Sequence, residues 1–224
     1  MPLEPQQFIP ISKCTAELDY EWEDAAESKY IREDRGLTSR LEKVSQRSVG
    51  AIALGCAEWL FWRVHSYPDS QLLKDAIDAF WVGLADMSLI LPLEGHPLFP
   101  RRKEWRGPVR GPIGSGYRLL ATVFESVRRG SFATTHTSCL SQLTSHIWKN
   151  APALKEWRKD LIERLIKMFP FNPDAPLGPL VVREMLDPNY VYDPARIPEL
   201  VNAHARSLGQ NPFLIAPFGE AAEK

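Results

Sequence analysis

Cysteine is scarce in this sequence: only three of its 224 residues are cysteines, and no two of them are spaced as Cys-x-x-Cys. An odd number of widely separated cysteines excludes a disulfide-bonded scaffold and lacks the paired spacing of a zinc ribbon or finger. The HExxH zinc motif and the EF-hand calcium loop are missing as well. We therefore expect a reducing compartment, the cytoplasm, and neither a metal nor another cofactor.

Long hydrophobic runs and a strong net charge are also missing. The longest apolar run, 49–64, contains Glu58 and is shorter than the roughly 20 residues that a membrane-spanning helix needs. The first residues, MPLEPQQFIPISKC, lack the basic and apolar regions of a secretory signal. A net charge of −1 argues against a dedicated nucleic-acid-binding domain, which is usually markedly basic. We expect a soluble protein that does not contact a membrane and is not a dedicated nucleic-acid binder.

Strand patterns are absent too, whereas apolar residues recur at helical spacing from end to end. The spacing predicts an all-α fold, a multi-helix bundle of antiparallel helical hairpins with a long Pro/Gly-rich loop. Ser39 and Glu42 have the spacing of a capping box and predict the start of the central helix. The expected helices cover about 16–34, 39–65, 69–90, 117–129, 134–149, 152–168, 180–186 and 194–208.

The predicted loop is the segment 91–116, in which proline and glycine are dense. We expect a single helical domain, 1–224, whose sub-bundles at about 16–90 and 117–208 are joined by this loop. Its GPIGSG stretch has neither the GxGxxG order nor the GK[ST] ending of a phosphate-binding loop. The stretch therefore predicts an approach to the next helix and not a nucleotide site.

Two charges, Glu58 and Arg63, interrupt the apolar run of the expected central helix. They are five residues apart and lie on different faces, so they are not expected to satisfy each other. A buried charge needs a partner, and one interpretation is that each forms an ion pair with another element. The alternative is an all-helical enzyme that uses Glu58 with His65 or His136 as acid and base.

The near-neutral total hides two oppositely charged segments. Residues 17–35 hold eight acids against three bases, and residues 101–118 hold six bases against one acid. The segments could be solvated, could pair with each other, or could steer a charged protein partner. Aromatic residues among such charges are typical of interface hot spots. The candidate partner-binding residues are Glu17, Asp19, Glu21, Trp22, Glu23, Asp24, Glu27, Arg101, Arg102, Trp105 and Arg106.

The hairpin over 41–90, with ALGCAEWLFWRV and DAFWVGLAD, resembles helical bacterial immunity proteins, which neutralise toxins exchanged between competing cells. The resemblance covers about a quarter of the chain and transfers no residue positions. It implies a small cytoplasmic protein without an active site, which binds a cognate toxin domain and neutralises it. The helical enzyme stays an alternative, as does a nucleic-acid or scaffold adaptor that uses the basic segment. A homodimer would also use exposed aromatic residues.

Overall fold

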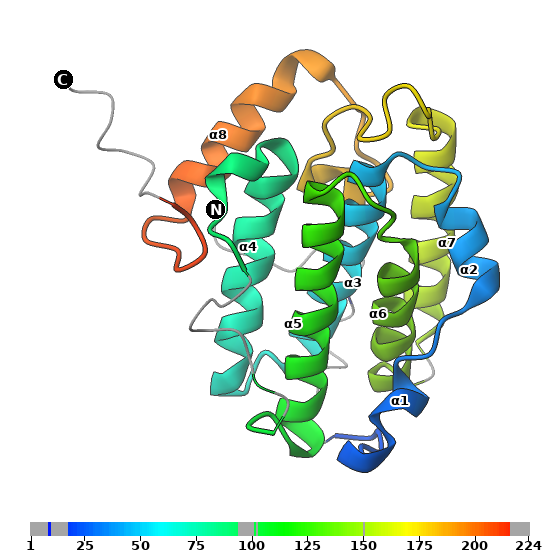
Figure 1. The fold of residues 1–224 in the computed structure, drawn as a ribbon, viewed down its shortest axis with the longest axis vertical. Coiled ribbons are helices and arrows are strands. Elements are labelled where there is room, and N and C mark those ends of the chain that lie inside the picture. Colours follow the sequence, from blue (N-terminus) through cyan, green and yellow to red (C-terminus); the bar gives the residue numbers. More distant parts are fainter. Residues whose placement is uncertain (1–8, 10–17, 94–100, 102, 150, 216–224) are drawn as a thin grey trace.

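The computed structural model describes residues 9, 18–93, 101, 103–149 and 151–215, and the all-α multi-helix bundle is confirmed (Figure 1). Across these residues, extended pairing is limited to two isolated bridges, between Val44 and Pro170 and between Ile90 and Leu214. The α-helices are α1 (Glu27–Tyr30), α2 (Arg35–Leu41), α3 (Gln46–Val64), α4 (Gln71–Ala85), α5 (Gly107–Arg128), α6 (Thr134–Ile147), α7 (Pro152–Met168) and α8 (Ile197–Ser207). Short 3-10 turns lie at 24–26, 68–70, 87–89, 183–186 and 194–196.

Helix α3 is the centre of the bundle, as its all-round apolar sequence predicts. Every residue of α3 is buried except Arg47 and Trp62. The helix packs against α4, α5, α6 and α7, so one apolar cluster runs through both expected sub-bundles. None of the helices in the described part of the chain is long and apolar enough to cross a membrane.

The predicted start of α3 is wrong. Ser39 lies inside α2, and α3 begins only at Gln46, where the hydroxyl of Ser45 accepts a hydrogen bond from the Ser48 backbone N–H. The carboxylate of Asp34 caps α2 by accepting the Leu37 N–H at 3.0 Å. Short polar side chains are more favourable at such caps than inside helices. The caps at Asp34 and Ser45 give two helices, α2 and α3, where a single helix was expected to start at Ser39.

The predicted long acidic helix over 16–34 is also wrong. From Leu18 to Glu23 the described chain is not helical, and only a 3-10 turn and the four-residue α1 follow before α2 begins. The apolar spacing there was compatible with a helix, but Asp24 and Asp34 accept hydrogen bonds from the first turns of other helices instead. Tertiary contacts outweigh the weak local preference.

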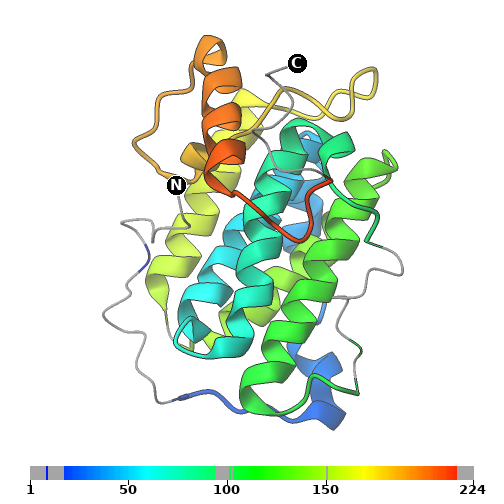
Figure 2. The ribbon, with the colours of Figure 1, turned by 90° about the vertical axis from the view of Figure 1, so that its left-hand side faces the viewer.

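The predicted loop over 91–116 is wrong in its second half, because α5 begins at Gly107 and contains GPVRGPIGSG. Pro108 occupies the first turn, where proline is tolerated, but Pro112 lies inside the helix. The start of α5 lies beside α1 at one end of the bundle, and α8 lies at the opposite end (Figure 2). The acidic and basic segments therefore meet at the α1 end.

Candidate functional site

A pocket of about 490 Å³ lies at the start of α5, between the two charged segments. Its walls come from α1 and the residues just before it, from the turn that leads into α5, and from the first half of α5. The lining residues are Trp22, Asp24, Ala25, Glu27, Lys103, Trp105, Arg106 and Ser115. Five of these eight are candidate partner-binding residues from the sequence, so the fold brings the two predicted segments to one site.

Tyr20 explains how α5 can begin within a Pro/Gly-rich sequence. Pro112 has no N–H to donate to the carbonyl of Pro108, four residues earlier, which would leave that carbonyl without its helical partner. The Tyr20 hydroxyl donates to the Pro108 oxygen at 2.5 Å instead. Tyr20 is buried, and its burial raises the pKa of the phenol, opposed by the nearby Arg63 guanidinium. The acidic segment thus completes the helix of the basic segment.

Two glycines of α5 make room for the tryptophans that line the pocket. A Cβ atom at Gly111 would lie 2.1 Å from Nε1 of Trp22, and one at Gly114 would lie 2.7 Å from Cβ of Trp105. Both indoles therefore pack directly on the helix backbone, which no larger residue would allow. The glycines that led to the prediction of a loop instead form a surface of α5 on which the two tryptophans pack.

Asp24 joins the two segments electrostatically. Its two carboxylate oxygens each accept the backbone N–H of Gly107 at 3.1 Å, and one of them also accepts the Trp22 indole N–H at 2.8 Å. A carboxylate at the first N–H of a 22-residue helix is stabilised by the positive end of the helix dipole. Asp24 therefore has a structural role inside the site, in addition to lining the pocket.

Glu27 has a similar inward role. It is buried and accepts a hydrogen bond from the Ser115 hydroxyl and one from Nη2 of Arg118 at 2.7 Å. Arg118 also donates to the Ser115 oxygen at 3.0 Å. The three groups form an ion-paired cluster at the base of the pocket, and Ser115 is held as a donor to a carboxylate that Arg118 neutralises.

The other candidate residues in the described part of the chain, Asp19, Glu21, Glu23 and Arg101, do not line the pocket. Asp19 binds Nη2 of the buried Arg63 at 2.5 Å, which gives Arg63 the partner that Glu58 does not supply. The carboxylates of Glu21 and Glu23 are exposed beside the pocket, and Arg101 pairs with Glu104 at 3.9 Å. Glu17 and Arg102 fall outside the described residues.

The candidate set from the sequence lacked Ala25, Lys103 and Ser115 of the pocket lining, and it gave Tyr20 no role beyond that of an aromatic residue in the acidic segment. Lys103 belongs to the basic segment but has no aromatic or helical pattern to single it out. The sequence signal for Tyr20 is Pro112, which lies inside α5. A proline inside a helix leaves the carbonyl four residues earlier without its usual N–H donor, so another group must supply one. That signal is readable only once the segment is known to be helical.

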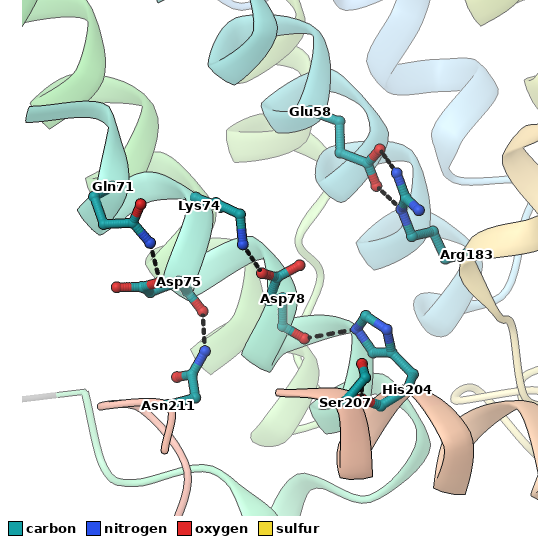
Figure 3. Close-up of polar contacts among 9 residues, drawn as sticks. All are labelled: Glu58, Gln71, Lys74, Asp75, Asp78, Arg183, His204, Ser207 and Asn211. Atoms are coloured by element: carbon teal, nitrogen blue, oxygen red, sulfur yellow. Dashed lines mark hydrogen bonds and ion pairs between the residues drawn. The ribbon is translucent and has the colours of Figure 1, made fainter. Parts of the chain in front are cut away.

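Glu58 lies in a separate buried network, between α3, α4 and the C-terminal segment (Figure 3). Its carboxylate is 0% exposed and accepts the Trp81 indole N–H at 2.9 Å and two N–H groups of Arg183, each at 2.9 Å. His65 instead hydrogen-bonds the Trp62 carbonyl at 2.7 Å. A general base must reach a proton of the substrate, which an enclosed carboxylate does not do. The surroundings of Glu58 are therefore those of a structural ion pair.

A second set of contacts, close to this one, attaches α8 to α4 (Figure 3). Lys74 donates to Asp78 at 2.6 Å, and the ring of His204 lies 3.1 Å from the Asp78 carbonyl oxygen (Figure 3). Burial raises the pKa of Asp78 and lowers the pKa of His204. These shifts come from desolvation inside a packed interface, and they make the attachment of α8 sensitive to pH.

Within the described ranges, no three or more His, Cys, Asp or Glu side chains are grouped so that they could hold a metal ion. The chain matches no family model, and comparisons with curated proteins and with solved structures gave no significant match.

Proposed function

We propose that this protein is a non-catalytic binding module whose partner is another protein, contacted at the pocket at the start of α5. The convergence of the two charged segments on that pocket carries the proposal. Trp22 and Trp105 are fixed against the α5 backbone, so their contact area is available without a large cost in side-chain entropy. Tryptophans in a pocket surrounded by charge are characteristic of interface hot spots.

The charges left at this end of the bundle are mixed, which favours a protein partner over a nucleic acid. In the basic segment, Arg110 pairs with Asp69 at 3.0 Å and Arg118 pairs with Glu27. Lys103 and Arg106 line the pocket, and the exposed acids Glu21 and Glu23 lie close by. A surface for a phosphate backbone would need a continuous basic stripe, which these residues do not form.

The resemblance to helical immunity proteins supports a cognate toxin domain as the partner, with neutralisation in the cytoplasm as the function. The acidic carboxylates available to such a toxin are fewer than the sequence indicated. Asp24 and Glu27 are used inside the fold, which leaves Glu21 and Glu23 as the exposed acids beside the pocket. Charge complementarity of this kind increases the association rate more than the final affinity.

The test is to express the toxin domains encoded beside this chain and measure binding by calorimetry and protection of growing cells. Trp105→Ala should raise the Kd at least about thirtyfold, the loss expected for a hot-spot tryptophan. Glu21→Lys with Glu23→Lys should slow association and reduce protection. Asp174→Lys with Glu199→Lys is the matched control, because both acids are exposed and lie away from the pocket.

The proposal is overturned if no neighbouring toxin binds, or if the Trp105 variant folds normally and binds and protects as well as the native chain. Circular dichroism separates a binding defect from a folding defect. Reversal of Asp24 or Glu27 is unsuitable as a test, since either change would disrupt the start of α5.

A further inference from the structure

Two further hollows adjoin one another along α6, on the far side of α1 from the pocket at the start of α5. One, of about 540 Å³, lies between α6 and the segment 29–34, and the other, of about 500 Å³, lies between the C-terminal half of α6 and α7. They share Gln142 and Ser145 and so lie next to each other, and the two hollows together are called the α6 groove. A groove of this length fits an extended chain better than a compact metabolite.

Four basic side chains line the α6 groove: Lys29 and Arg32 in one hollow, and Lys155 and Arg158 in the other. Arg158 is half-buried and donates to the hydroxyl oxygens of Ser141 and Ser145, the latter at 3.1 Å. No carboxylate of the described chain lies within 4 Å of any of these four groups. A partly desolvated guanidinium bound only by neutral hydroxyls retains a strong preference for an anion.

Both acids that line the groove, Glu33 and Asp34, already accept hydrogen bonds within the fold. Glu33 accepts hydrogen bonds from the hydroxyls of Thr38 and Thr135, at 2.9 and 3.4 Å. Asp34 caps α2 with one oxygen and accepts the Gln142 amide with the other at 3.1 Å. The hydrogen-bonding capacity that faces the groove is therefore mainly that of cationic donors.

Other side chains cover the aromatic rings of Tyr30 and Trp148 at the groove, which favours a peptide over a nucleic acid as the ligand. Tyr30 stacks on His146 at 4.2 Å and on Trp22 at 4.9 Å between ring centroids, so both of its faces are covered. Trp148 is buried and donates its indole N–H to the Trp59 carbonyl at 2.6 Å. Tyr30 and Trp148 therefore offer nucleobases no open ring on which to stack, whereas side-chain carboxylates need only the cations.

We infer that the α6 groove binds an extended acidic peptide segment, whose carboxylates contact Lys29 and Arg32 at one end and Arg158 and Lys155 at the other. Arg158 supplies the fork-shaped donor for a bidentate contact with one carboxylate. This inference does not depend on the toxin partner of the proposed function. If the two are linked, the acidic segment belongs to the partner bound at the α5 pocket.

The experiment uses the full chain and a fluorescein-labelled peptide of alternating glutamate and alanine, followed by fluorescence anisotropy at about 50 and 300 mM salt. Saturable binding that weakens at the higher salt is expected. Arg158→Gln should raise the Kd about tenfold, and Lys29→Glu with Arg32→Glu should do the same at exposed positions that do not disturb the core. Lys43→Glu with Lys167→Glu is the matched control, because both lysines are exposed and lie outside the groove.

Two results would overturn the inference. One is the absence of saturable binding up to roughly millimolar peptide, or binding that the groove variants and the control variant weaken equally. The other is tighter binding of a single-stranded oligonucleotide than of the peptide, lost in the same groove variants, which would assign the groove to nucleic acid. A peptide of alternating lysine and alanine should not bind. If no toxin binds but the acidic peptide does, the inference about the groove stands and only the proposed function is rejected.

Discussion

Replacing Arg183 with methionine is expected to cost about 3–5 kcal/mol of unfolding free energy at neutral pH. The carboxylate of Glu58 is 0% exposed and would lose both of its hydrogen bonds to Arg183 but keep the one from the Trp81 indole. The remaining carboxylate would stay desolvated without its counter-charge, which is why removing one partner of a buried ion pair is so destabilising.

The assay is urea unfolding followed by circular dichroism, with the midpoint and the slope both fitted. Changing both partners, Glu58→Met with Arg183→Met, should recover most of the loss, because an apolar pair of similar volume replaces a desolvated ion pair. Arg40→Met is the matched control, since the pair with Glu163 is 3.5 Å apart and exposed and should contribute less than about 1 kcal/mol. A loss below about 1 kcal/mol for Arg183→Met, or a double variant no more stable than the single one, would refute the reasoning.

Three further predictions concern the start of α5 and the attachment of α8. Tyr20→Phe should destabilise the chain by about 1–3 kcal/mol in the same assay, because the Pro108 carbonyl loses the donor that Pro112 cannot supply, whereas Tyr30→Phe should change little. Gly111→Ala should cost about 1–3 kcal/mol and shift the tryptophan fluorescence, since its Cβ would displace the Trp22 indole; Gly36→Ala, exposed in α2 with its Cβ 3.3 Å from Oδ1 of Asp34, should cost less and leave the fluorescence unchanged. Because burial lowers the pKa of His204, the unfolded chain takes up this proton first as the pH falls below the usual histidine range near 6.5, so this histidine should make stability decrease between pH 7 and pH 5; Asp78, whose pKa burial raises, acts in the opposite direction at lower pH. His204→Gln should reduce that decrease, and an unchanged pH profile would argue against the interface described for α8.

The sequence predicted those helices whose apolar pattern is strong and uninterrupted. Helices α4, α6 and α7 lie within the predicted ranges, and Gly209, with φ of +56°, lies just past α8 as expected of a helix end. The five-residue spacing of Glu58 and Arg63 correctly indicated separate partners, which are Arg183 and Asp19. Neither partner could be identified in advance, because both come from segments far away in the chain.

The sequence singled out the two charged segments, but it left open whether they meet and what their charges do. The two charged segments do meet, but Asp24 and Glu27, taken from the sequence as outward-facing acids, point inward to Gly107 and to Ser115 and Arg118. Composition shows how many charges a segment carries. It does not show which of them the fold needs as hydrogen-bond acceptors.

By itself the sequence determined the fold class and the central position of α3, because hydrophobic periodicity is a local property that burial preserves. Only the tertiary structure decided that GPVRGPIGSG is a helix and that 18–23 is not. Proline and glycine weaken a helix locally, and α5 forms there because Tyr20, Trp22 and Asp24 supply a donor, a packing surface and a cap from another segment. Contacts between distant segments can reverse a local preference of a few kcal/mol, and no window of the sequence contains both sides of such a contact.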